Sequence, residues 1–64
     1  MKVKYDKEAD VLYIKFSNKA IAESDSDKPG IILDYDDKQN IVGLEVLNAS
    51  QKMEKPLNVE YEAA

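Results

Sequence analysis

The chain has 64 residues and a mass of 7.2 kDa, which is enough for one small domain with a modest core. Thirteen acidic residues stand against nine lysines, giving a net charge of −4, and the sequence contains no arginine, histidine or cysteine. This composition excludes disulfides, thiolate metal sites and catalysis by histidine or cysteine, and it disfavours nucleic-acid binding. We therefore expect a single domain over residues 1–64, compact over 2–54, with 55–64 as a tail or an extra strand, and no enzymatic activity.

Alternating and β-branched residues predict a series of short strands separated by polar turns. In chain order these strands are Lys2–Asp6, Val11–Phe16, a weaker Ala20–Ser24, Ile31–Tyr35 and Ile41–Leu47. Residues 25–30 are expected to form a loop. Asn48 is a good N-cap for a helix over 49–54, which Pro56 would end. The expected fold is mainly β (α+β): a single antiparallel meander sheet of about five strands with a short C-terminal helix.

The last two strands fix their own register, because both carry one apolar row. These rows share a face only if the numbers of opposed residues add up to an odd number. A four-residue loop over 37–40 meets this condition by pairing Asp36 with Ile41 and Leu33 with Leu44. The predicted core face holds Val3, Tyr5, Leu12, Ile14, Phe16, Ile31, Leu33, Val42, Leu44 and Val46. The other face holds Val11, Tyr13, Lys15, Ile32, Asp34, Gly43, Glu45 and Leu47.

Three segments of the chain follow a recognisable pattern. They are Tyr5-Asp6-x-Glu8-x-Asp10-x-Leu12-Tyr13-Ile14, Gly30-Ile31-Ile32-Leu33-Asp34-Tyr35-Asp36 and Val42-Gly43-Leu44-Glu45-Val46-Leu47-Asn48-Ala49-Ser50. Together they resemble the small bacterial domain-of-unknown-function family 2283. The resemblance implies a compact sheet with a short helix and no assigned reaction. Because members are often encoded beside small toxin-like proteins, it also implies an antitoxin-like or accessory role.

Two carboxylates are the best candidates for a ligand site. In the predicted register Asp34 and Glu45 are diagonal neighbours on the second face, with Tyr13 and Lys15 beside them. Oxygen ligands of this kind could hold a divalent cation or a small ligand. The simpler interpretation is a solvated polar face with lysine counter-charges. An EF-hand is not expected, because Lys38 stands where such a loop needs an oxygen ligand. No cofactor is expected.

The second face also carries apolar side chains that a single-layer sheet would leave in water. The candidate interface residues are Val11, Tyr13, Ile32, Ile41 and Leu47. Exposed apolar patches often mark interfaces, and small cores are often completed by oligomerisation, so we expect a homodimer. Acids over 25–27 and 34–37 favour a basic protein as an outside partner. No apolar run approaches membrane-spanning length, so we expect no membrane partner and a cytoplasmic location.

Overall fold

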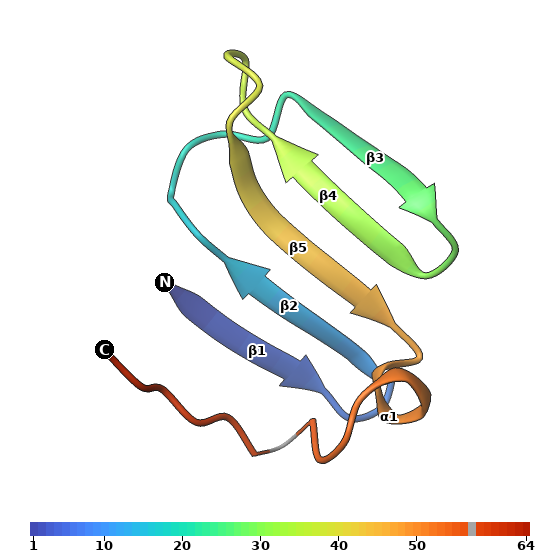
Figure 1. The fold of residues 1–64 in the computed structure, drawn as a ribbon. Helices are drawn as coiled ribbons and strands as arrows, with labels where there is room; N and C mark the ends of the chain where they lie inside the picture. The colour runs from blue at the N-terminus through green and yellow to red at the C-terminus, as the bar shows by residue number, and fades with distance from the viewer. Residues whose placement is uncertain (57) are drawn as a thin grey trace.

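All strands of the molecule join one open sheet (Figure 1). The computed structural model describes residues 1–56 and 58–64, without the side chain of Asp27. The elements of these residues are β1 (Lys2–Asp6), β2 (Val11–Lys15), β3 (Glu23–Lys28), β4 (Ile31–Tyr35), β5 (Ile41–Leu47) and α1 (Ala49–Lys52). The sheet is antiparallel with the strand order β1-β2-β5-β4-β3. The predicted fold class, one antiparallel sheet of five strands with a short helix, is confirmed.

The strand order differs from that of a simple meander, in which β2 would lie beside β3. Instead β5 lies between β2 and β4, and β3 lies at the edge. The physical reason is polarity. The central strands β2, β4 and β5 are the apolar ones, whereas β3 has the sequence ESDSDK. An edge strand has one side open to water, which is where a polar strand costs least.

The third strand lies later in the chain than its expected position of Ala20–Ser24. It spans Glu23–Lys28, and a turn through Pro29 and Gly30 (φ 80°) leads into β4. Residues 25–28, expected as a loop, are therefore in the strand. Ser24 pairs with Asp34, and the Ser24 hydroxyl donates a hydrogen bond of 2.6 Å to the Asp34 carboxylate. These tertiary contacts outweigh the low strand propensity of the segment.

The β4–β5 hairpin has the expected register along most of its length. Leu33 pairs with Leu44 as predicted, and Asp34 pairs with Gly43. Beyond that point a β-bulge leaves Val42 without a partner in β4, so Tyr35 pairs with Ile41. The predicted pairing of Asp36 with Ile41 is therefore wrong.

Asp36 builds the hairpin loop instead of pairing in the ladder. Its carboxylate accepts hydrogen bonds from the backbone N–H of Lys38 (2.9 Å), and from the N–H (2.8 Å) and side-chain amide (3.1 Å) of Asn40. These bonds, those from Asn40 above all, hold the pKa of the Asp36 carboxyl below its ordinary value.

The helix begins where expected and is shorter than expected, ending at Lys52. Asn48 is left-handed (φ 53°) and makes no side-chain capping bond, so its predicted role is wrong. Asp10, forty residues before Ser50, takes that role: its carboxylate accepts the N–H of Ser50 (3.0 Å) and the hydroxyl of Ser50 (2.7 Å). Its backbone carbonyl accepts the N–H of Ala49.

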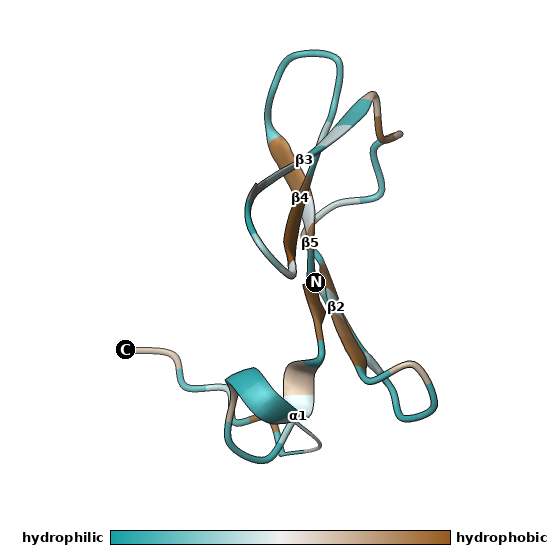
Figure 2. Ribbon diagram, turned by 90° about the vertical axis from the view of Figure 1, so that its right-hand side faces the viewer, coloured by the Kyte–Doolittle hydropathy of each residue, from teal (hydrophilic) through white to brown (hydrophobic). Residues whose placement is uncertain are grey.

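The helix and the C-terminal segment lie on one side of the sheet, here called the helix side (Figure 2). The buried residues Leu12 and Val46 of the sheet and Ala49 of α1 form the core cluster, with Met53 packed against it. Of the predicted core face, Val3 is 39% exposed and Phe16 45% exposed, so the core is smaller than predicted.

Residues 58–64 form no strand, and Leu57, where an extra strand was expected to begin, lies outside the described residues. Within the described part of the chain, no helix has the length and apolarity needed to cross a bilayer.

Candidate functional site

The face opposite the helix brings the predicted carboxylate pair together. Asp34 pairs with Gly43, and Glu45 pairs with Tyr13 on one side and Ile32 on the other. Asp34 and Glu45 are therefore diagonal neighbours, as the register predicted. Asp34 is only 2% exposed, because neighbouring side chains lie over it.

Gly43 makes room for the side chain that closes over Asp34. A Cβ built on Gly43 would lie 2.8 Å from the Tyr13 hydroxyl oxygen and 3.2 Å from Asp34 Oδ2. The Tyr13 ring thus crosses β5 at the one residue without a side chain and ends beside Asp34. Burial, reinforced by the charges of Asp34 and Glu45, raises the pKa of the Tyr13 phenol.

Tyr13, Gly43, Asp34 and Ser24 come from β2, β5, β4 and β3, so this polar group links four strands of the sheet. The Ser24 hydroxyl already donates to Asp34 Oδ1. Among the residues whose side chains the structure describes, no group of three or more Asp, Glu, His or Cys is placed to hold a metal ion. What the arrangement does is join strands: it fixes β2 and β3 to the central pair through buried polar contacts.

A second polar group, around Asp10, was not singled out by the sequence. Asp10 is left-handed (φ 55°) and its carboxylate also accepts the Tyr5 hydroxyl at 2.6 Å. The bond from Tyr5, followed by the bonds from Ser50, lowers the pKa of the Asp10 carboxyl, and the same contact raises the pKa of Tyr5. The sequence signal for this group was Asp10 itself, because an Asp directly before a strand is typical of a turn. Its partner at position 50 is too distant in sequence to infer.

The candidate interface residues are not all on one face. Val11 pairs with Leu47, and Tyr13 and Ile32 flank Glu45, so these four share the face opposite the helix and are half-buried. Ile41 is separated from them by the bulge. It pairs with Tyr35, on the helix side, and is 48% exposed.

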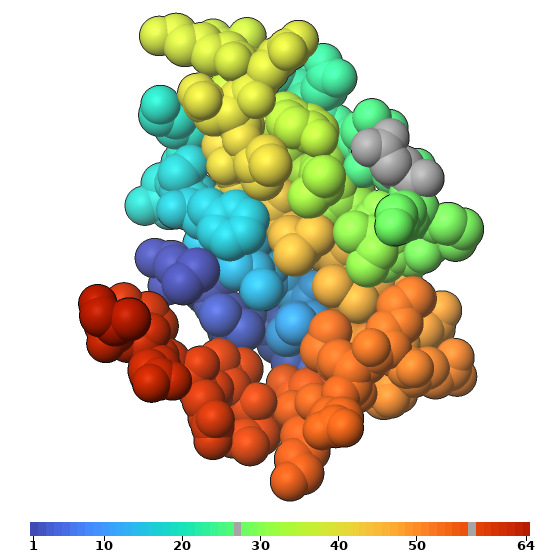
Figure 3. Space-filling model, in the orientation of Figure 1, coloured from blue at the N-terminus to red at the C-terminus, as the bar shows by residue number. Residues whose placement is uncertain are grey.

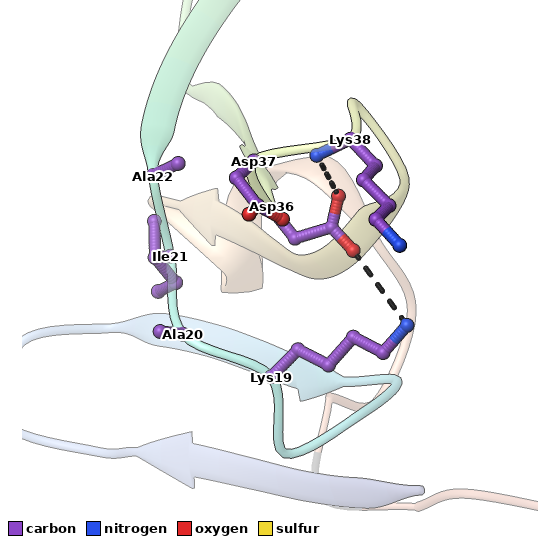
Figure 4. A pocket seen from close by; sticks show the side chains of 7 residues that line it. All are labelled: Lys19, Ala20, Ile21, Ala22, Asp36, Asp37 and Lys38. Atoms are coloured by element: carbon purple, nitrogen blue, oxygen red, sulfur yellow. Dashed lines mark hydrogen bonds and ion pairs between the residues drawn. The ribbon is translucent and has the colours of Figure 1, made fainter.

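An open cleft of about 470 Å³ lies between the β2–β3 connection and the hairpin loop (Figure 4). It is lined by Lys19, Ala20, Ile21, Ala22, Asp36, Asp37 and Lys38. Lys19 Nζ lies 4.0 Å from Asp36 Oδ2 and the backbone N–H of Lys38 donates to the same carboxylate. Asp36 is therefore engaged by the protein itself, and the cleft contains none of the predicted site residues.

Comparison with known proteins identifies one family. The model of a family of proteins of unknown function, DUF2283, matches residues 2–50, which is most of the chain. No curated protein and no solved structure matches. The match covers every strand of the sheet and the start of α1. This chain therefore belongs to the DUF2283 family, whose function is unknown.

Proposed function

We propose that this chain is a small, non-catalytic protein-interaction module that works as a self-associated dimer. The observation that carries this proposal is the accessible surface of the molecule, which is larger than that of a compact monomer. The molecule exposes 5176 Å², whereas a compact monomer of its mass exposes about 4,100 Å². The excess is comparable to the roughly 800 Å² that each partner loses in a standard protein–protein interface.

The shape of the molecule supports the same proposal. The radius of gyration is 12.3 Å, against about 10.7 Å for a compact domain of this length. The principal extents are 33 × 31 × 20 Å, which describe a slab. Both the single-layer sheet and residues 58–64, which form no helix or strand, contribute to this shape. A flat molecule with open faces gains more from association than a rounded one.

We propose a non-catalytic role because the polar side chains that could react are already hydrogen-bonded within the fold. The hydroxyls of Ser24 and Ser50 donate to Asp34 and Asp10, and the chain has no histidine to act as their base. The Asp36 carboxylate accepts three hydrogen bonds within its own loop. These side chains make structural hydrogen bonds, so few polar groups are left to act as a nucleophile or a base.

An outside partner of this module would be a basic protein. Net charge is −4, and Glu23, Asp25 and Asp37 are exposed, whereas Asp34 and Asp36 are buried and already hydrogen-bonded. The acidic surface thus lies along β3 and the hairpin tip rather than over residues 34–36. An antitoxin-like role is one case of such binding. Affinity for a captured basic partner should fall steeply with salt, and a salt-independent complex would contradict this part.

Sedimentation velocity tests self-association directly. We expect a particle of about twice 7.2 kDa at micromolar concentrations. A 7.2 kDa particle across the micromolar range would overturn the proposal.

A further inference from the structure

We infer that a second copy of this chain packs on the helix side of the sheet, over the part that α1 leaves open, and not on the opposite face. This inference rests on the proposed self-association and identifies the surface through which the two copies bind. The open part is a row of cross-strand neighbours, here called the open row: Val3, Ile14, Leu44 and Leu33.

The open row is continuous and uncharged across four strands, and on the fifth strand, β3, the exposed Asp25 pairs with Leu33 at the edge of the sheet. Val3 pairs with Ile14, Ile14 with Leu44, and Leu44 with Leu33. None of the four is buried, and Val3 is 39% exposed. Figure 3 shows this side: the helix and C-terminal residues (orange to red) cover its lower part, while β1, β2, β5 and β4 reach the surface above.

The helix is too short to cover the whole side. Its four residues span about 6 Å at 1.5 Å per residue, whereas the seven residues of β5 span about 23 Å. The buried cluster beneath it is centred on one row, here called the covered row: Tyr5, Leu12, Val46 and Ile31. Ile14 and Leu44 of the open row pack against the edge of this cluster.

The opposite face is a poorer interface because Lys15 of β2 and Glu45 of β5 place charges on two of its inner strands. Lys2 pairs with Lys15, and Glu45 lies between Tyr13 and Ile32. The centres of stable interfaces are depleted of charged residues. Packing a second copy there would bury these charges, and a buried charge without a partner is strongly destabilising.

A second copy fits the open row because it brings an equivalent surface. A twofold dimer buries the same patch on both subunits, so each open row would pack against the apolar side of the other sheet. Face-to-face sheets pack about 10 Å apart, with their side chains between them. The molecule as a whole, residues 58–64 included, exposes about 1,000 Å² more than a compact monomer, and an interface of this kind takes roughly 800 Å² from each copy.

A matched pair of valine substitutions tests the choice of face. Val3→Glu places a carboxylate at the exposed end of the open row, and Val11→Glu places the same group on the opposite face. By sedimentation velocity we expect Val3→Glu to weaken dimerisation by about tenfold or more, and Val11→Glu by less than about twofold. Far-UV circular dichroism checks that each variant is folded.

Phe16→Ser is a second helix-side variant, in case Val3→Glu fails to fold. Phe16 follows Ile14 by two residues, donates its N–H to Val42 and is 45% exposed. It too should weaken the dimer. A dimer that resists both helix-side variants, or that Val11→Glu dissociates equally, overturns the choice of face but leaves self-association intact. A wild-type monomer instead overturns the proposed function itself.

Discussion

The two rows on the helix side are both uncharged and mostly aliphatic, but their surroundings differ. In the covered row Leu12 is 8% exposed and lies in the core with Ala49. In the open row Val3 is 39% exposed and no residue is buried. Both rows are built by the same strands with the same alternation. The comparison shows that an apolar pattern identifies a face, whereas burial depends on what covers it.

The polar group around Asp10 holds α1 in place over the covered row. Its carboxylate holds Ser50 at the start of α1 and Tyr5 at the end of β1, while its carbonyl holds Ala49. One residue thus attaches the helix to the covered row. The open row has no such attachment, and in our proposal a second copy supplies its cover.

The largest expected effect is a difference in the loss of stability between alanine variants of two leucines, one in each row. Leu12→Ala should destabilise the fold by about 2–5 kcal/mol at any protein concentration, because it leaves a cavity under α1. Leu44→Ala should cost less in dilute solution and approach that value once the dimer forms. Urea denaturation at two protein concentrations measures both. Equal and concentration-independent penalties would mean that the two rows do not differ as described.

A smaller effect is expected at Gly43, on the opposite face. Gly43→Ala places a methyl group 2.8 Å from the Tyr13 hydroxyl oxygen and should cost about 1–3 kcal/mol through overpacking. The penalty should shrink in a Tyr13→Phe background, where that oxygen is gone. Thermal denaturation of the four chains in this cycle measures the coupling. An unchanged penalty would show that the ring does not depend on Gly43.

The attachment of the helix should respond to pH. The hydrogen bonds from Tyr5 and Ser50 lower the pKa of Asp10 below its ordinary value of 3.8. A lowered folded-state pKa means that protonation favours the unfolded chain. The stabilisation is therefore complete above the ordinary value and is lost as pH falls through the folded value. We expect a falling Tm below about pH 4, with a weaker dependence in Asp10→Asn. Identical pH profiles for the two chains would argue against this role.

The smallest effect is expected from divalent cations on the opposite face. Asp34 is buried and accepts the Ser24 hydroxyl, so its oxygens are poorly available as ligands. Millimolar calcium or magnesium should leave Tm unchanged. A saturable rise in Tm that disappears in both Asp34→Asn and Glu45→Gln would instead establish a cation site.

The sequence predicted the strands that carry apolar alternation. Residues 2–6, 31–35 and 41–47 are strands as expected, and Leu33 pairs with Leu44. The diagonal placement of Asp34 and Glu45 followed from the same alternation. These features depend on local periodicity, which a single sequence contains.

The features that were missed depend on contacts between distant residues. The polar β3 has no hydrophobic period, so only its pairing with β4 shows its position. The central place of β5 depends on which apolar strands are flanked by a strand on both sides, and the sequence does not determine that order. The bulge at Val42 moves Ile41 to the helix side, away from the other interface candidates. The cap from Asp10 joins residues forty positions apart.

The dependence of Tm on protein concentration tests most directly whether a second copy completes the helix side. Association that accompanies folding makes Tm rise with concentration, because only the folded state binds. We predict a rise from low-micromolar to near-millimolar protein for the wild type and a much smaller one for Val3→Glu. A Tm that is constant over this range in the wild type would contradict self-association and, with it, a second copy on the open row.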